Sequence, residues 1–535
     1  MTLSGILSIF DQLPAYQQVN DTVRSNQHRD PLRLPTSGRA PILSRLFLDQ
    51  TRPILLITGR VDAVAQWQQA LETWLPDERV ILRFTEPTPL PYERGPWSGR
   101  SRLDRLTVFT RLLAGQHPLI PAAATPPLII TSARALLQKT LPRSRFIAAT
   151  RVLKPGQMFD LEKTLQTWQE SGYEAVTVVE APGQFSRRGG ILDLYPANSS
   201  ALPVRIELFG DEIDTIRYFD PATQRSLDGQ IAPVTRVIVP PAREAMPAVA
   251  QGLGAYLEGE TQTTGTTICP PGEDDISDLL SGQPSPHLEY YLPLMYSQPG
   301  TLLDYLPENA LVVVDDWLDL LTAARELHNH ADQLANEQAS LPPDYPNPLF
   351  AWDDMAERLS SKQPLILGDS AEGDNAPVSE LADHFQTGPR YGGQVRPLMA
   401  QLSNAQANKE TTILVSRQAQ RLAELWRQRK HRNDAHTCPP STPPANCPAC
   451  PTNRSPLSRA VWLRGSTWMC RGRVGSCSAC SPTPKYLAGN GPNRANGLPR
   501  VRPRPKPRSP TSNPVITSSI WNMASASSRA LWCAR

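Results

Sequence analysis

The sequence has 535 residues and a formal net charge of +3. This length exceeds that of one ordinary domain and predicts three or four domains. The charge averages two unlike parts. Residues 435–535 contain no Asp or Glu and 14 Lys and Arg, which leaves residues 1–434 with a net charge of −11. Seven of the eight cysteines also lie after residue 434. The acidic part has only Cys269, which excludes a disulfide framework there.

The start of the chain and its hydropathy pattern predict a cytosolic protein. Residues 1–18 have no basic n-region and carry Asp11 within their apolar part, which is atypical of a signal peptide. No apolar run reaches the roughly 18 residues that a membrane-spanning helix needs. We therefore expect a cytoplasmic protein with no membrane partner.

Buried strands followed by amphipathic helices recur along the first part of the chain. Residues 53–58 (PILLIT) and 127–131 (PLIIT) are typical of buried strands, and residues 63–75 and 133–138 after them carry apolar residues at helical spacing. This alternation predicts a parallel α/β layer. Residues 311–315 (LVVVD) predict a further strand of the same layer, which resumes after an insertion.

The insertion has the pattern of a small antiparallel sheet. Three short segments with period-2 alternation follow one another: residues 190–196 (GILDLYP), 203–210 (PVRIELFG) and 214–220 (DTIRYFD). A Pro-rich linker follows the second part of the parallel layer, at residues 342–348. Residues 412–416 (TILVS) and 417–429 then predict one more strand and helix.

Three stretches of the sequence resemble bacterial transcription-repair coupling factors. Residues 185–214 (FSRRGGILDLYPANSSALPVRIELFGDEID) resemble the UvrB-interaction domain of that family. Residues 289–316 resemble its second nucleotide-binding-like lobe, and residues 391–394 (YGGQ) with 415–425 (VSRQAQRLAEL) resemble the small domain after it. UvrB shares the first two features and is the nearest rival.

The resemblance implies an α/β fold with four components. These are a degenerate P-loop-like parallel α/β layer, an inserted small antiparallel α+β UvrB-interaction domain that binds UvrA, a further small α/β domain, and a disordered tail. The expected limits are 1–150 and 241–341 for the two parts of the α/β lobe, 151–240 for the inserted domain, 342–360 for a linker, 361–432 for the small domain and 433–535 for the tail.

The phosphate loop distinguishes an ATPase of the UvrB type from a nucleotide-free relative. A working loop needs Gly-x4-Gly-Lys-Ser/Thr, because backbone amides cradle the phosphates, the Lys neutralises them and the hydroxyl holds magnesium. The aligned place here reads Ser37-Gly38-Arg39-Ala40, with Arg in place of Lys and Ala in place of Ser or Thr. No magnesium-binding hydroxyl remains there.

A second trace of nucleotide chemistry is Asp315-Asp316, which follows a buried strand where UvrB-like ATPases place Asp-Glu. Both motifs have the alternative interpretation of ordinary loop residues, and both interpretations predict no ATP hydrolysis. We expect ATP and magnesium to bind only in motor domains that this chain lacks. The competing functional class is an ATP-dependent DNA translocase or helicase, or a UvrB-like excinuclease subunit.

Residues 203–210 offer a candidate interaction surface. Side chains alternate across a strand, so Arg205, Glu207 and Phe209 share one face and the aliphatic residues share the core face. An Arg beside an exposed aromatic ring is the composition of an interface hot spot. The alternative is that Phe209 lies under a loop while Arg205 pairs with Glu207 or a neighbouring acid.

The resemblance assigns this surface to UvrA. The family's UvrA contact uses an Arg in the RG turn, an Arg in the next strand and a Phe near its end, which match Arg188, Arg205 and Phe209, with Arg187 as the neighbouring candidate. We expect guanidinium groups to pair with carboxylates of UvrA while the ring fills a pocket. Ala at residue 205 or 209 is then expected to abolish UvrA binding without unfolding the domain.

The same resemblance implies a truncated coupling factor. Without the RNA-polymerase-interacting domain and the two motor lobes, RNA polymerase and duplex DNA are not expected to bind this chain. The net charge of −11 in residues 1–434 predicts weak direct binding to DNA. In the family the C-terminal domain is thought to mask the UvrA surface, so this chain is expected to expose it constitutively and to compete with UvrB.

Residues 435–535 have three interpretations. Two CxxC pairs, Cys447 with Cys450 and Cys477 with Cys480, suit a zinc ribbon. Residues 500–508 (RVRPRPKPR) suit a basic arm that binds nucleic acid. The third interpretation, which we favour, is out-of-frame translation, because neither alternative explains about a hundred residues that lack an acid and are crowded with Pro, Arg, Ser, Ala and Trp.

A codon test supports a shifted reading frame. Trp and Met have single codons and Asn has two, so moving the frame back one base forces Glu from Trp521-Asn522 and a Gly shortly after. The remaining codons permit DYVVH-x-EHGIG, which resembles the segment that opens the RNA-polymerase-interacting domain of coupling factors. We expect the break soon after Arg429.

Overall fold

The computed structural model describes most of the chain up to residue 436 and four strands beyond it. The described residues are 3–25, 30–77, 80–198, 202–227, 231, 234–253, 279–280, 285–337, 345–369, 379–391, 394–408, 410, 412–415, 418–436, 460–464, 467–468, 519–525 and 528–534. They divide into two compact units, residues 2–382 and residues 383–535. Each unit is described by itself.

The first unit is built on a five-stranded parallel sheet in the order β12-β11-β1-β3-β2. Its strands are β1 Ile54–Thr58, β2 Ile81–Phe84, β3 Leu128–Ser132, β11 Leu311–Val314 and β12 Leu365–Ile366. Every residue of β1, β3 and β11 is buried, which explains their unbroken runs of aliphatic residues. The three strands predicted from those runs are confirmed.

The helices of this unit include those expected after the first and second predicted strands. They are η1 Ser4–Gln12, α1 Pro14–Ser25, α2 Thr36–Asp49, α3 Val61–Trp74, α4 Gly99–Leu113, α5 Ala133–Leu137, α6 Arg143–Ala149, α7 Leu161–Glu170, η3 Leu288–Tyr291, α10 Leu292–Met295, α11 Leu302–Tyr305, α12 Trp317–Glu337 and α13 Trp352–Ser361. In α3 the buried residues are Val64, Trp67, Leu71 and Trp74. This spacing of three and four residues is that of one helix face.

A small sheet is inserted between the third strand of the parallel layer and β11. The chain enters the insertion through β4 (Arg151–Leu153) and leaves it through β10 (Val237–Val239), and these strands pair antiparallel. β11 then lies beside β1, with Ile54 opposite Leu311. The layer therefore resumes after the insertion, as predicted.

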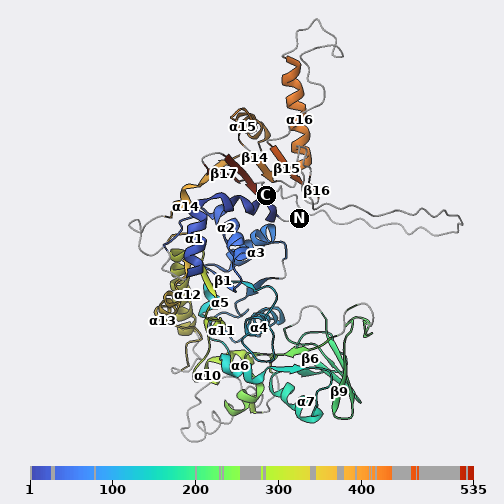
Figure 1. The fold of residues 1–535 in the computed structure, drawn as a ribbon. Helices are drawn as coiled ribbons and strands as arrows, with labels where there is room; N and C mark the ends of the chain where they lie inside the picture. The colour runs from blue at the N-terminus through green and yellow to red at the C-terminus, as the bar shows by residue number, and fades with distance from the viewer. Residues whose placement is uncertain are drawn as a thin grey trace, which may run out of the picture. The chain divides into compact units, whose positions relative to one another are not determined.

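The inserted sheet has the strand order β5-β6-β7-β8-β9. Its strands are β5 Glu174–Ala175, β6 Gln184–Arg188, β7 Ile191–Leu194, β8 Val204–Phe209 and β9 Glu212–Tyr218. All neighbours pair antiparallel except β5 and β6, which confirms the antiparallel character expected of this region. Helix α7 lies beside the sheet (Figure 1). Its Trp168 packs on the sheet, with a ring centroid 5.5 Å from that of Phe185.

The second unit contains two three-stranded sheets, β13-β17-β18 and β14-β15-β16. Its elements are β13 Phe385–Arg390, α15 Val395–Ala407, β14 Thr412–Val415, α16 Ala419–His436, β15 Ala460–Arg464, β16 Thr467–Trp468, β17 Ser519–Ser525 and β18 Ser528–Ala534, and α14 Glu380–Asp383 lies at its border. Its core contains Tyr391, Leu398, Met399, Leu402, Leu414 and Trp426. The strand and helix predicted from residues 412–429 are confirmed.

Several expectations for the tail fall outside the described residues. These include the four cysteines of the two CxxC pairs and the basic residues 500–508. The described part of the tail consists of the end of α16 and of β15 to β18, and Trp521 and Asn522, which the codon test uses, lie in β17. Zinc binding, a basic arm and a shifted frame therefore remain predictions.

The structure differs from the expected linker and small domain in two respects. Helix α13 (Trp352–Ser361) overlaps the expected linker, 342–360, and β12 lies within the expected small domain although it pairs with β11 of the main sheet. A strand of two residues gives no periodic signal, so the sequence does not predict it. The remaining domain limits stay predictions. Among the described residues no helix is both long and apolar enough to cross a membrane.

Candidate functional site

The strand register defines the face of the inserted sheet that lies away from α7. We call it the exposed face because Arg188 and Phe209 are exposed on it, although Asp193 on the same face is buried. Arg188 on β6 pairs with Ile191 on β7, which in turn pairs with Glu207 on β8. Paired residues lie on the same face of a sheet, as do residues two positions apart along a strand. Arg205 and Phe209, on either side of Glu207, therefore share this face with Arg188.

The opposite face is buried and lies against α7. Its buried residues are Phe185, Leu192, Leu194, Val204, Ile206, Ile213 and Ile216. Arg187 belongs to this side, and its Nη1 lies 2.7 Å from Oε1 of Glu162 on α7. The two adjacent arginines thus point to opposite faces, and only Arg188 lies on the face of Arg205 and Phe209.

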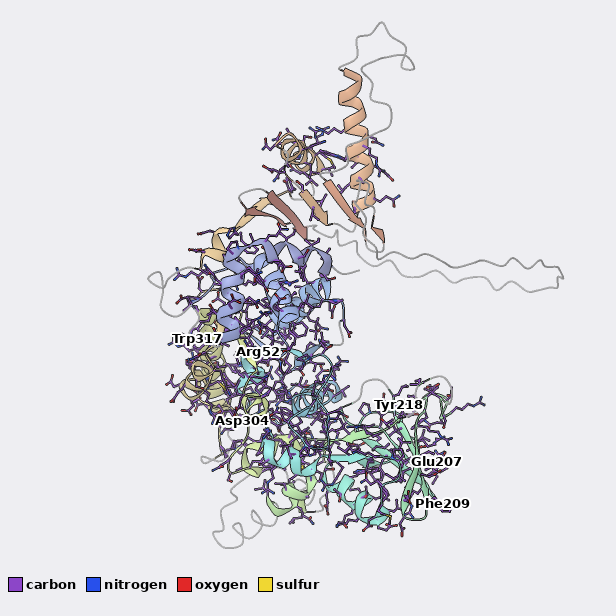
Figure 2. All side chains as sticks on the ribbon, in the orientation of Figure 1. Arg52, Glu207, Phe209, Tyr218, Asp304 and Trp317 are labelled. Carbon is purple, nitrogen blue, oxygen red and sulfur yellow. The ribbon has the colours of Figure 1, made fainter. Side chains whose placement is uncertain are left out.

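Phe209 is exposed over 83% of its surface, the largest exposed fraction among the large hydrophobic side chains that the structure describes. It is the last residue of β8, beyond Glu207 (Figure 2). A two-residue turn follows, in which Gly210 has a φ of 60°, a value that favours glycine. The alternative interpretation placed the ring under a loop, and the exposure of Phe209 contradicts this part of it.

Arg205 is engaged within the sheet. Its Nε and Nη2 donate to the two carboxylate oxygens of Asp193, at 2.7 and 2.9 Å. Asp193 lies directly opposite Arg205, on β7. The guanidinium also lies 5.1 Å from the ring centroid of Phe219. The hydrogen bonds to Asp193 raise the pKa of Arg205 above its ordinary value. Arg205 thus pairs with a neighbouring acid, as the other part of the alternative interpretation expected.

The three predicted residues share a face without forming one cluster. Arg188 is exposed, and its Nη2 donates to the backbone oxygen of Thr177 at 3.0 Å. Glu207 lies between Arg205 and Phe209, which are about 13 Å apart along the strand. The Oε2 atom of Glu207 is 3.5 Å from Nη2 of Arg217 on β9. Their joint role in UvrA binding stays a prediction.

The segment predicted to be a degenerate phosphate loop is the start of α2. Leu32 and Leu34 donate backbone hydrogen bonds to Ile366 and Leu367, so the residues before α2 lie beside β12, although they form no strand and Arg33 has a φ of 48°. Residues 37–40 all lie within the first turns of that helix, and Ala40 is buried. Residues 32–36 contain no glycine, so no glycine-rich loop precedes the helix.

Arg39 forms ion pairs with Asp315 and Asp316, the second predicted trace of nucleotide chemistry. Its Nη1 lies 2.8 Å from Oδ1 of Asp315, and its Nη2 lies 3.4 Å from Oδ2 of Asp316. Its Nε donates to the backbone oxygen of Leu34 at 2.9 Å. The indole N–H of Trp67 occupies the second carboxylate oxygen of Asp315, at 2.8 Å. The side chains of Arg39 and both aspartates are less than a quarter exposed.

The packing around Arg39 does not fit a bound ATP and magnesium. A Cβ atom added at Gly368 would lie 2.4 Å from Nη2 of Arg39 and 2.4 Å from Oδ2 of Asp316, so the backbone closes directly over the ion cluster. The backbone N–H of Asp369 also donates to Asp316 at 3.1 Å. Protein groups therefore fill the place that phosphates and a cation need.

Sequence reasoning missed two kinds of participant. Trp67 and Gly368 carry no local motif, and only the packing of α3 and β12 brings them to Arg39. Asp193 lies in the DLYP segment that supported the resemblance, but its pairing with Arg205 depends on the register of β7 and β8. A register analysis of the two predicted strands is the signal that would have found it.

The comparisons with known proteins agree with this organisation. Residues 152–244 match the family model of the UvrB interaction domain, a range that holds the inserted sheet and α7. Similar curated proteins are the transcription-repair-coupling factors of Bacillus subtilis, 31% identical over 314 residues, and of Haemophilus influenzae, 32% identical over 231 residues. The N-terminal part of the chain is thus similar to that of transcription-repair coupling factors.

The match with coupling factors extends beyond the inserted domain. The protein of Myxococcus xanthus is 26% identical over 454 residues, which cover 79% of this chain and 36% of that protein. The Bacillus subtilis match covers 57% of this chain and 25% of the relative, and the Haemophilus influenzae match covers 42% and 19%. The chain therefore spans only part of the length of the coupling factors that it matches.

Proposed function

We propose that the exposed face of the inserted sheet binds UvrA and that this binding is the activity of the described part of the chain in transcription-coupled nucleotide excision repair. The observation that carries the proposal is the exposure of Phe209 on the face that also holds Arg188 and Arg205. An isolated exposed ring is unremarkable. Phe209, however, lies in a domain that matches the UvrB interaction family and on the same face as both arginines. Its ring is therefore a candidate anchor for UvrA.

The three side chains have different roles in this proposal. Phe209 fills an apolar pocket of UvrA, and Arg188, which is exposed, pairs with a carboxylate of UvrA. Arg205 has donated two hydrogen bonds to Asp193, so it offers UvrA only its remaining N–H groups. It also fixes the position of the strand that carries the ring.

UvrA binding to variants of the full chain tests the proposal. Phe209→Ala and Arg188→Ala are the informative changes, because both side chains are exposed and their loss leaves the core intact. Leu318→Ala on α12 is the matched control, since it removes an exposed apolar side chain from the α/β lobe. Calorimetry is expected to show loss of UvrA binding for the first two variants only. Binding at wild-type affinity by Phe209→Ala would overturn the proposal.

The competing function, an ATP-dependent DNA enzyme, is opposed by the ion cluster around Arg39. We propose that the α/β lobe holds its fold through that cluster and binds no nucleotide, and that RNA polymerase and duplex DNA are not partners of the described residues. Calorimetry with ATP and magnesium on the full chain is expected to show no saturable heat. Saturable binding that Asp315→Asn abolishes would favour the enzyme class instead.

A surface that UvrB and this chain both present to UvrA predicts competition between them. We propose that the full chain displaces UvrB from UvrA, because one UvrA site cannot hold two inserted domains. Titration of a labelled UvrA–UvrB complex with the chain tests this. The Phe209→Ala variant is expected to leave the complex intact, and displacement by both forms alike would contradict the proposal.

A further inference from the structure

Met158 and Phe209 are the two most exposed large hydrophobic side chains among the described residues, at 71% and 83%. The next most exposed is Leu119 at 49%. Both lie in the inserted domain, although more than fifty residues of chain separate them. Large apolar side chains that gather at one exposed place indicate an interaction surface.

The backbone places Met158 and Phe209 on either side of one residue. Phe209 pairs with Glu212 across the turn between β8 and β9, and Met158 forms a bridge with Glu212 from the other side. Directly paired residues share a face, so the three side chains lie in one row. Two strand spacings separate the outer residues, which places them about 10 Å apart.

Three backbone hydrogen bonds fix the segment that carries Met158 against β9. Gly156 donates to Ile213 at 2.7 Å, Ile213 donates to Gln157 at 2.9 Å, and Phe159 donates to Asp211 at 2.7 Å. Gly156 has a φ of 77°, a value that favours glycine and turns the chain into this pairing.

The residues after Met158 anchor the segment to the core. Phe159 is 3% exposed, and its ring centroid lies 6.4 Å from that of Trp168. The side chain of Asp160 then caps α7, since it accepts a hydrogen bond from the backbone N–H of Lys163 at 3.1 Å. Met158 therefore points outward from a backbone that is held on both sides.

We infer that Met158, Glu212 and Phe209 form a second, contiguous part of the UvrA-binding surface, and this inference rests on the proposed function. The partner surface presents two apolar pockets about 10 Å apart, with a basic side chain between them that pairs with Glu212. The row continues the face of Arg188 and Arg205, because Phe209 belongs to both. Met158 is thus a specificity-determining contact that lies outside the UvrA-binding residues of β6 and β8.

The affinity of purified UvrA for three variants of the full chain tests the inference. Met158→Ala is expected to weaken binding about tenfold, because a buried thioether side chain is lost from the complex. Phe209→Ala is expected to weaken it by more, and Leu318→Ala is expected to bind like the wild type. Since Met158 is 71% exposed, its replacement is expected to leave the thermal unfolding midpoint unchanged.

The outcomes separate the inference from the proposed function. Wild-type affinity of Met158→Ala beside lost binding by Phe209→Ala would overturn the inference and leave the proposed function standing. Wild-type affinity of both variants would overturn both. Weakened binding by Met158→Ala alone would overturn the inferred row, because its two apolar residues are required together.

The charge of Glu212 gives an independent measurement. Glu212→Lys is expected to weaken binding more than Glu212→Gln does, since it sets two positive charges against each other. The weakening by Glu212→Lys is expected to shrink as salt is raised from 50 to 500 mM, because exposed charges are screened. Equal affinities of the Lys and Gln variants at low salt would overturn the assignment of a basic group on the partner.

Discussion

The guanidinium of Arg39 lies 2.8 Å from the carboxylate of Asp315, although 276 residues separate the two along the chain. The contact joins the first turn of α2 to the end of β11, and Asp316 shares the same guanidinium. In a P-loop ATPase, phosphates lie at a helix N-terminus and magnesium is held beside an acidic residue. Here a side chain of the protein supplies the positive charge, so the lobe needs no ligand to balance its two aspartates.

Arg39→Ala is expected to lower the free energy of unfolding by about 2 kcal/mol, because two largely buried carboxylates lose their counter-charge and a hydrogen bond each. Urea unfolding followed by tryptophan fluorescence measures the change. Arg60→Ala is the control, since that side chain is 65% exposed and lies 3.6 Å from Asp319. Its effect is expected to stay within about 0.5 kcal/mol. An equally small effect of Arg39→Ala would contradict a structural role for the cluster.

Arg205→Ala is expected to destabilise the inserted domain as well as to weaken UvrA binding. Asp193 is 2% exposed, so removal of its bidentate partner leaves a buried carboxylate uncompensated, at a cost of about 3 kcal/mol. This differs from the sequence-based expectation that the variant keeps its fold. Thermal unfolding of Arg205→Ala beside Phe209→Ala measures the difference, and only the first midpoint is expected to fall.

A double variant separates the two effects at residue 205. Arg205→Ala combined with Asp193→Ala removes both charges and is expected to recover most of the lost stability. If the double variant binds UvrA like the wild type, Arg205 acts only as a support for β8. If it folds and does not bind, the guanidinium contacts UvrA. Equal unfolding midpoints of the single and double variants would contradict the pairing itself.

The sequence predicted those parts of the fold that depend on local pattern. The runs PILLIT, PLIIT and LVVVD became β1, β3 and β11, because strands buried on both faces must be aliphatic throughout. The alternation in residues 203–210 predicted which side chains of β8 face the core. Both inferences use periods of a few residues, so no knowledge of distant contacts was needed.

Features that depend on distant contacts were beyond the sequence. Arg39 and the two aspartates were recognised as separate traces, but only the fold shows that they pair. Met158 gave no signal, since its exposure follows from a bridge to Glu212 far along the chain. The two residues of β12 are too few for a periodic pattern. In each case the deciding quantity is a tertiary register, which one sequence without relatives does not contain.

Glu244→Ala is expected to cost about 4 kcal/mol of stability, because it leaves a fully buried arginine without its counter-charge. Arg105 is 0% exposed, donates two hydrogen bonds to Glu244, and lies between the rings of Phe84 and Trp97, at 4.1 and 5.1 Å from their centroids. Urea unfolding measures the loss. Glu162→Ala, which breaks the exposed pair with Arg187, is the control and is expected to cost within about 0.5 kcal/mol.

Asp104 is expected to make stability fall as pH rises through the acidic range. Burial raises the pKa of this carboxyl above its ordinary value, although Arg100 and Arg83, at 3.0 and 3.5 Å, act in the opposite direction. Because the folded state then holds the proton more tightly than the unfolded state, the protonated form favours folding, and that contribution is lost as pH rises through the raised pKa. The window lies above the ordinary aspartate pKa of about 3.9.

Asp104→Asn removes this titration while it keeps the shape of the side chain. The stability of the wild type relative to the variant is therefore expected to decrease from about pH 4 to pH 7, in urea unfolding at constant ionic strength. A relative stability that increases with pH would mean that the two arginines outweigh burial at Asp104, and it would reverse the sign of the assigned shift.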